Sequence, residues 1–72
     1  MNIKKIGYNI MDDMAVARIS FSELSRRMGC ARSTITNRVH NPERMKLGDF
    51  CRIAQELGKT PAELLEGVWT DS

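Results

Sequence analysis

Two helical segments near the middle of the chain are joined by only two or three residues, one of which is Gly29. The segments span about residues 20–28 and 32–40. Each has a pair of apolar residues four positions apart, namely Leu24 with Met28 and Ile35 with Val39. Residues four apart lie on one face of a helix. A glycine tolerates the left-handed conformation that ends many helices. The pattern therefore predicts two short helices in a helix-turn-helix arrangement.

Local signals set the ends of these helices. The first begins with "SFSE", which is typical of a capping box. In this box the Ser20 hydroxyl accepts a hydrogen bond from the Glu23 N–H, and the Glu23 carboxylate reaches back to the backbone N–H of Ser20. The second helix ends before Pro42, because the residue before a proline is biased away from the helical conformation. We expect residues 41–46, "NPERMK", to form a loop.

The other apolar residues also follow a helical spacing, and no alternating pattern typical of a strand continues for long. Three further helices are predicted: one over residues 3–17, one over residues 47–57, and one that starts at Pro61 after the cap Thr60 and ends at Gly67. Thr60 and Glu63 give the last of these a capping box. The predicted inward residues are Ile3, Ile6, Ile10 and Met14; Leu47, Phe50, Ile53, Ala54 and Leu57; and Leu64 and Leu65. The fold class is therefore all-α, with five short helices in a single domain over residues 1–72.

The length and composition restrict the class of protein. A stretch of 72 residues holds one small core, so we expect no separate catalytic or sensor domain. There is no run of about 18 apolar residues and no signal peptide at the start, so we expect no membrane span and a cytoplasmic protein. Cys30 and Cys51 are then interpreted as reduced thiols used as small core residues, with one disulfide as the alternative.

The chain lacks the residue patterns of an enzyme or a metal site. It has no pairing of a nucleophile with a base, no glycine loop for phosphate and no facing pair of carboxylates. His40 is the only histidine, and no cysteine, histidine or carboxylate lies at ligand spacing from it. We therefore expect no catalysis, no cofactor, no metal and no small-molecule ligand.

Basic residues concentrate in the middle of the chain. Residues 18–46 hold seven Lys or Arg and two Glu, a net charge of +5, whereas residues 47–72 have a net charge of −3 and residues 1–17 are neutral. A basic segment of this kind attracts a polyanion such as nucleic acid. The alternative is a solvated surface on which the charges happen to cluster.

The order of these features resembles the lambda-repressor-like (Cro/Xre-type) helix-turn-helix family over roughly residues 3–66. The resemblance is carried by "ISFSELSRRMGCARSTITNRVHN" followed by "LGDFCRIAQELGKTPAELL". The ending "TNRVHNP" resembles a phage-type branch of the family. In this family the helix that corresponds to residues 32–40 lies in the major groove of DNA, with its N-terminal half against the base edges.

The resemblance also implies which residues touch DNA. Arg32, Ser33 and Asn37 occupy the base-reading positions, and Thr36 lies on the same exposed side. Arg32 suits a bidentate pair with guanine and Asn37 one with adenine, each worth about 1–3 kcal/mol of discrimination. Contacts to the DNA backbone are expected from Ser20, Ser22, Thr34, Arg38, His40, Asn41 and Arg44.

The sequence departs from the family pattern at three positions. Phe21 stands where the family usually has a glutamine that touches phosphate and braces the recognition helix. Ala31 stands where a serine or threonine cap is common, which predicts a weaker start for the next helix. Arg38 stands where many relatives bury a leucine or isoleucine, and Val39 is expected to take the inward role.

These implications predict a sequence-specific DNA-binding transcription regulator, a Cro-like phage or prophage repressor. It would bind a palindromic operator in double-stranded DNA as a homodimer, because two half-sites require two recognition helices. Trp69 is expected either to fold back onto the protein or to lie in the dimer interface, and we favour an interface through Val68 and Trp69. The alternative is an antitoxin or a protein-interaction module on the same fold, for which Phe21 is the motivation.

Overall fold

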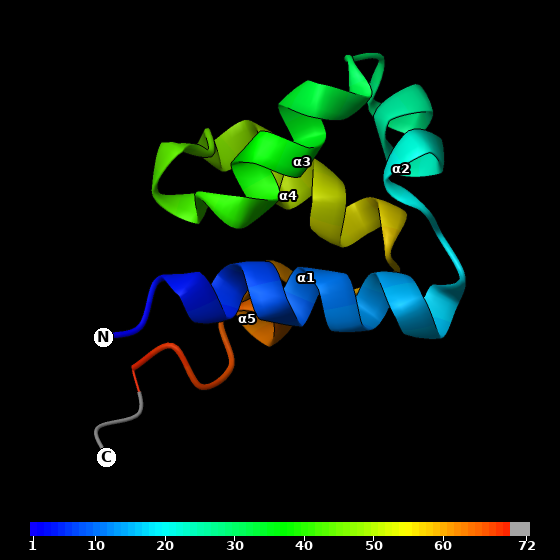
Figure 1. The fold of residues 1–72 in the computed structure, drawn as a ribbon. Coiled ribbons are helices and arrows are strands. Elements are labelled where there is room, and N and C mark those ends of the chain that lie inside the picture. Colours follow the sequence, from blue (N-terminus) through cyan, green and yellow to red (C-terminus); the bar gives the residue numbers. More distant parts are fainter. Residues whose placement is uncertain (70–72) are drawn as a thin grey trace.

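The computed structural model describes residues 1–69, and every regular element in that part of the chain is helical. The elements are α1 (Lys4–Ala17), α2 (Phe21–Met28), α3 (Arg32–His40), the 3₁₀-helix η1 (Pro42–Arg44), α4 (Leu47–Glu56) and α5 (Pro61–Leu64) (Figure 1). The predicted all-α fold of five short helices is confirmed, but the predicted loop over residues 41–46 contains η1. None of these helices is long and apolar enough to cross a membrane.

The longest helix, α1, packs against several of the other elements. It extends along one side of the molecule, beneath α3 and α4 in the view of Figure 1, and packs against α3, η1 and α5. Arg18 ends it in the left-handed conformation, with φ 58°, and its N–H donates to the carbonyl of Ala15 at 3.2 Å. This turn directs the chain away from α1 and into α2 (Figure 1).

One hydrophobic core forms where the helices meet. Ile10 from α1, Leu24 from α2, Ile53 from α4 and Leu64 from α5 have no exposed surface, and Val39 from α3 is 1% exposed. The predicted inward spacing is therefore correct at most positions of all five helices. Burial of side chains of this size contributes about 1.5–3 kcal/mol each, relative to leaving them in water.

The prediction that Leu47 faces the core is wrong, since its side chain is 75% exposed. Leu47 is the first residue of α4, and Lys46 before it is in the extended conformation. The helix begins at the surface and reaches the core only with Phe50. Helical spacing gives the face on which Leu47 lies but not the depth at which the helix starts.

The segment after α5 folds back onto α1. Val68 is completely buried, and the N–H of Asn2 donates to its carbonyl at 2.6 Å. The side-chain amide of Asn9 donates to the carbonyls of Leu64 and Glu66 at 2.9 and 2.8 Å. The prediction that Val68 lies in a dimer interface is therefore wrong, because Val68 belongs to the core of its own chain. Trp69, in contrast, does not fold back and is 62% exposed.

Both cysteines are free and exposed, so the prediction that they are core residues is wrong. Cys30 follows Gly29 in the turn between α2 and α3, where the chain lies at the surface. Cys51 lies on the outer side of α4, because the inward side of that helix is taken by Phe50, Ile53 and Ala54. The expectation of free thiols agrees with the structure, and no disulfide joins this pair.

The two predicted capping boxes have different outcomes. At α5 the box is complete: the Glu63 N–H donates to the Thr60 hydroxyl at 3.2 Å, and the Thr60 N–H donates to the Glu63 carboxylate at 3.1 Å. At α2 only half forms, because the Glu23 N–H donates to Ser20 Oγ at 3.1 Å while the Glu23 carboxylate accepts from Arg26 instead. The reciprocal bond predicted at Ser20 is replaced by an ion pair with the guanidinium group.

Candidate nucleic-acid interface

Helices α2 and α3 form the predicted helix-turn-helix pair. Gly29 ends α2 in the left-handed conformation with φ 69°, and the N–H of Cys30 donates to the carbonyl of Ser25 at 3.0 Å. Ala31 then precedes α3 in the extended conformation and makes no side-chain capping bond. The chain thus turns sharply with a glycine where the backbone requires positive φ. The weaker start predicted for α3 agrees with this uncapped end.

The outer side of α3 borders a shallow open groove. Ile35 and Val39 point into the core, and the polar residues between them point outward. The groove is lined by Arg32, Ser33, Thr36, Asn37, His40 and Asn41. All four residues predicted to contact bases therefore lie together, along with two of those predicted to contact the DNA backbone.

Hydrogen bonds within α3 determine what some of these side chains can offer a ligand. The Thr36 hydroxyl donates to the carbonyl of Arg32 at 2.9 Å, so its oxygen can still accept a hydrogen bond but its hydrogen is already used. The Asn41 amide donates to the carbonyl of Asn37 at 3.0 Å. The Arg38 guanidinium donates weakly to Asn37 Oδ1 at 3.5 Å, which leaves the Asn37 NH₂ group as its free donor.

An aromatic contact between α2 and α3 occupies the place of the family's bracing glutamine. The ring centroids of Phe21 and His40 are 6.2 Å apart, and the two ring planes are inclined at 35°. His40 Nδ1 lies 2.8 Å from the carbonyl of Thr36 and must carry the proton, because a carbonyl only accepts. Phe21 is also partly buried against the core. The two rings therefore fix the ends of α2 and α3 that face each other.

Five of the predicted backbone contacts lie outside the groove. These are Ser20, Ser22, Thr34, Arg38 and Arg44. Ser20 and Ser22 are exposed at the start of α2, where the Ser20 hydroxyl already caps the helix. Thr34 is exposed on α3, and Arg44 is exposed in η1. Contacts to phosphate need exposed donors, and Ser20, Ser22, Thr34 and Arg44 are exposed whereas Arg38 is partly buried.

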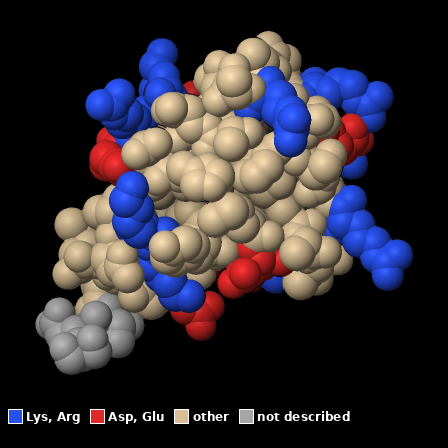
Figure 2. Space-filling view, viewed as in Figure 1, with Lys and Arg blue, Asp and Glu red and all other residues tan. Residues whose placement is uncertain are grey.

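Ion pairs compensate part of the positive charge in residues 18–46. Figure 2 shows Lys and Arg side chains at several edges of the molecule, some of them beside acidic groups. Arg26 and Arg27 both pair with Glu23. No ion pair within residues 1–69 involves the basic residues of α3, η1 and the next turn, namely Arg32, Arg38, Arg44 and Lys46. Ion pairs therefore compensate part of the charge on α2, whereas the arginines of α3 and η1 stay unpaired among the described residues.

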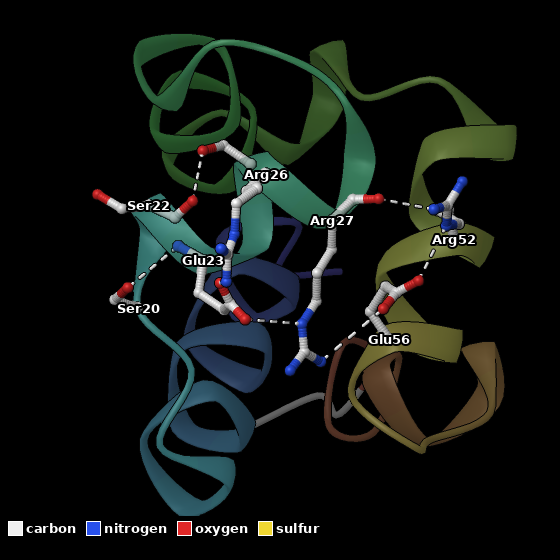
Figure 3. A network of polar contacts seen from close by, with 8 residues as sticks. Ser20, Ser22, Glu23, Arg26, Arg27, Arg52 and Glu56 are labelled. Atoms are coloured by element: carbon white, nitrogen blue, oxygen red, sulfur yellow. Dashed lines mark hydrogen bonds and ion pairs between the residues drawn. The ribbon is translucent and has the colours of Figure 1, made fainter.

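A polar network joins α2 to α4 (Figure 3). The Arg27 guanidinium lies between two carboxylates, with Nε 3.3 Å from Glu23 Oε1 and Nη1 3.8 Å from Glu56 Oε1. Arg52 donates to the carbonyl of Arg27 at 2.7 Å and to Glu56 at 3.1 Å. The hydrogen bond from Arg26 is the largest cause that holds the pKa of Glu23 below its ordinary value. Arg26 and Arg27 lie in the last turn of α2, where positive charge interacts favourably with the helix dipole.

Helix α1 contributes residues to this side of the molecule that the sequence did not indicate. Lys4, Gly7 and Tyr8 line a small pocket with His40 and the core residue Val39. The lysine amine donates to the carbonyl of His40 at 2.9 Å. Residues 1–17 have no net charge and no motif, so nothing in the sequence placed them beside α3.

This arrangement of a capped helix, a glycine turn and an outward polar helix agrees with a comparison of the whole sequence with protein families. Residues 9–68 match the Cro/C1-type HTH DNA-binding domain. The chain belongs to this family. No curated protein and no solved structure matched it. The Cro/C1-type match extends from the middle of α1 to Val68 and so includes all of α2 and α3.

Membership of the Cro/C1-type family supports DNA as the partner of this domain. Proteins of this family are typically DNA-binding regulators rather than enzymes. Among residues 1–69, no group of three or more His, Cys, Asp or Glu side chains could hold a metal ion.

Proposed function

We propose that the protein is a sequence-specific transcription regulator that inserts α3 into the major groove of operator DNA. The observation that carries this proposal is the groove on the outer side of α3, in which all four predicted base-contacting residues meet. Arg32 pairs with a guanine and Asn37 with an adenine. Ser33 and Thr36 contact neighbouring base edges, where the Thr36 methyl group suits the methyl of thymine.

The contacts to the DNA backbone come from both sides of this groove. Ser20 and Ser22 lie at the start of α2, and the other contributors are Thr34, Arg38, His40, Asn41 and Arg44. These contacts hold the register of the protein on DNA and carry no sequence information. Arg38 and Arg44 make no ion pair with the described residues, which favours them as partners of phosphate.

The biological role within this proposal is that of a Cro-like phage or prophage repressor in the cytoplasm. It binds a palindromic operator as a homodimer and blocks access of RNA polymerase. Trp69 supports the dimer, because a tryptophan that is 62% exposed leaves apolar surface for a second copy to cover.

A protein-interaction module, such as an antitoxin, is the second candidate. Its original motivation, Phe21, is weaker because that ring packs on His40 and the core. A groove lined by apolar residues favours it instead. This groove has a volume of about 250 Å³ and is lined by Ile6, Pro42, Met45, Leu47, Phe50 and Leu65.

Selection of duplexes from a random-sequence pool, followed by titration at several salt concentrations, tests the two candidates. A DNA-binding regulator selects a common sequence, and its affinity falls by orders of magnitude between about 50 and 200 mM salt. Arg44→Ala should weaken binding to all duplexes alike and reduce the salt slope by about one. If the pool yields no common sequence and binding is weak for every duplex, the proposal fails.

A further inference from the structure

Helix α1 meets the last turn of α3 at two successive carbonyl groups. Gly7 is buried there, and a Cβ at this position would lie 2.2 Å from the carbonyl oxygen of Val39. Lys4 Nζ donates to the carbonyl oxygen of His40 at 2.9 Å and lies 3.8 Å from the carboxylate of Glu43. Positions three apart share one face of a helix, so a single face of α1 makes both contacts.

The end of α3 needs a contact of this kind. The last four carbonyls of a helix have no partner within it, and a cation near them is favourable. Asn41 pairs with one of them, since its backbone and side-chain N–H groups donate to the carbonyl of Asn37 at 2.9 and 3.0 Å. Asn41 does not adopt the left-handed conformation that closes many helices, as its φ is −129°. The His40 carbonyl is satisfied from outside α3, by Lys4.

A second cation holds the other helix of the pair in the same way. Arg52 of α4 donates to the carbonyl of Arg27, in the last turn of α2, at 2.7 Å (Figure 3). In the last turn of each helix of the helix-turn-helix pair, a backbone carbonyl thus accepts a hydrogen bond from a basic side chain of another helix.

We propose that Lys4 is a positioning residue that fixes the direction of the recognition helix α3, and is not a contact to DNA phosphate. The inference rests on the proposed function. His40 and Asn41 line the α3 groove within the same turn that Lys4 holds, so a shift of this turn moves the groove relative to the bases. Hydrogen bonds to base edges depend on the position of the groove relative to the bases. Contacts to phosphate depend on that position much less.

The test compares Lys4→Met with Lys5→Met, which removes the same charge from the next residue. The side chain of Lys5 lies on the other side of α1, against Gly67, where a Cβ would be 3.1 Å from Lys5 Cε. The probes are a duplex selected from a random pool and a scrambled duplex of the same length. We expect Lys4→Met to bind the selected duplex about tenfold more weakly, which is the effect of one charge-assisted hydrogen bond. The affinity of Lys4→Met for the scrambled duplex should change less than about twofold. The affinity of Lys5→Met should change less than about twofold for both duplexes.

Two further measurements separate positioning from phosphate binding. Lys4→Arg keeps a donor and should restore most of the preference for the selected duplex. In the free protein, Lys4→Met should speed amide hydrogen exchange of Asn41, which donates to Asn37, while Lys5→Met leaves it unchanged.

Equal losses on both duplexes, with a salt slope reduced by about one, would make Lys4 a phosphate contact and overturn the proposal. An Asn41 exchange rate equal in the two variants would also overturn it. If no duplex is selected at all, the proposed function fails, whereas the exchange measurement still tests whether Lys4 holds the end of α3.

Discussion

At the scale of single residues, Gly7 lies at a close approach between two helices. Its position on α1 lets the backbone of that helix approach the end of α3 directly. A side chain here would meet a backbone carbonyl, which cannot move aside as a flexible side chain can. Gly7 is also a poor helix former, so the close contact offsets a local cost of about 0.5–1 kcal/mol. The sequence did not reveal this role, because Val39 is far away along the chain.

Gly7→Ala should therefore lower the free energy of unfolding by about 1–3 kcal/mol, the usual cost of overpacking, or by more. Chemical denaturation followed by circular dichroism measures the change. Gly48→Ala is the matched control, since Gly48 also lies in a helix but has no atom within 4 Å of an added Cβ. The control should be neutral or stabilising by about 0.5–1 kcal/mol. Equal stability of the two variants would contradict the close approach of α1 to α3.

At the scale of helices, the sequence predicted most element ends because these depend on neighbours in the chain. Ser20, Gly29 and Thr60 act through hydrogen bonds and backbone angles within a few residues of themselves. Where two nearby partners compete for one side chain, these local rules do not decide between them. The sequence predicted that Glu23 bonds the backbone, but the positions of Arg26 and Arg27 provide a stronger ionic partner.

The same distinction applies to the candidate site. The inward spacing of Ile35 and Val39 was sufficient to predict which side of α3 faces outward. The contacts of Lys4 with His40, of Phe21 with His40 and of Arg52 with Arg27 join residues 19 to 36 positions apart. Periodicity and capping carry no information at that range, so these contacts required the structure.

Arg52→Met tests the link between α2 and α4. This variant loses the bond to the Arg27 carbonyl and the pair with Glu56, and should lose about 1 kcal/mol of stability. Lys59→Met is the control, because Lys59 makes only an exposed pair with Glu63 at 3.8 Å. Such a pair contributes about 0–1 kcal/mol. In thermal unfolding, the Tm of Arg52→Met should be lower than that of Lys59→Met. The reverse order would contradict a stabilising link between α2 and α4.

Acid should weaken the start of α5 through Glu63. The backbone hydrogen bond from Thr60 is the largest cause that lowers the pKa of this carboxyl in the folded protein. Because the folded pKa lies below the unfolded value, the stabilisation is present above the ordinary value of 4.5 and is lost as the pH falls through the folded pKa. Glu63→Gln cannot titrate, so its Tm should fall less than that of the wild type between pH 6 and 3. Parallel curves for the two proteins would contradict this role of Glu63.

At the scale of the whole molecule, the surface of the described residues combines unpaired basic residues on α3 and η1 with several exposed apolar residues. Trp69 and Leu47 are 62% and 75% exposed, whereas Val68 is completely buried. Ion pairs partly compensate the positive charge of residues 18–46 on α2, and among the described residues they do not involve Arg32 and Arg38 of α3. The proposed function assigns the side of α3 to DNA and the exposed Trp69 to contact with a second copy.

Trp69→Ser should convert a dimer into a monomer without unfolding the domain, because the exposed indole is not part of the core. Sedimentation equilibrium at micromolar concentrations measures the association, and circular dichroism checks that the fold is kept. Val16→Ser is the control, since Val16 is 84% exposed near the end of α1. A monomeric wild-type protein, or a dimer that Trp69→Ser leaves intact, would contradict a dimer through this residue.

Insertion of α3 into the major groove is tested most directly by methylation protection of guanine N7 on a selected duplex. N7 lies in the major groove, where Arg32 is expected to bind it. The wild-type protein should protect one guanine in each half-site. Arg32→Ala should lose that protection, while the nuclease footprint over the flanking DNA backbone remains at saturating protein. Guanines that stay unprotected in the wild-type complex, or protection that persists in Arg32→Ala, would contradict the proposed role of Arg32 in the groove.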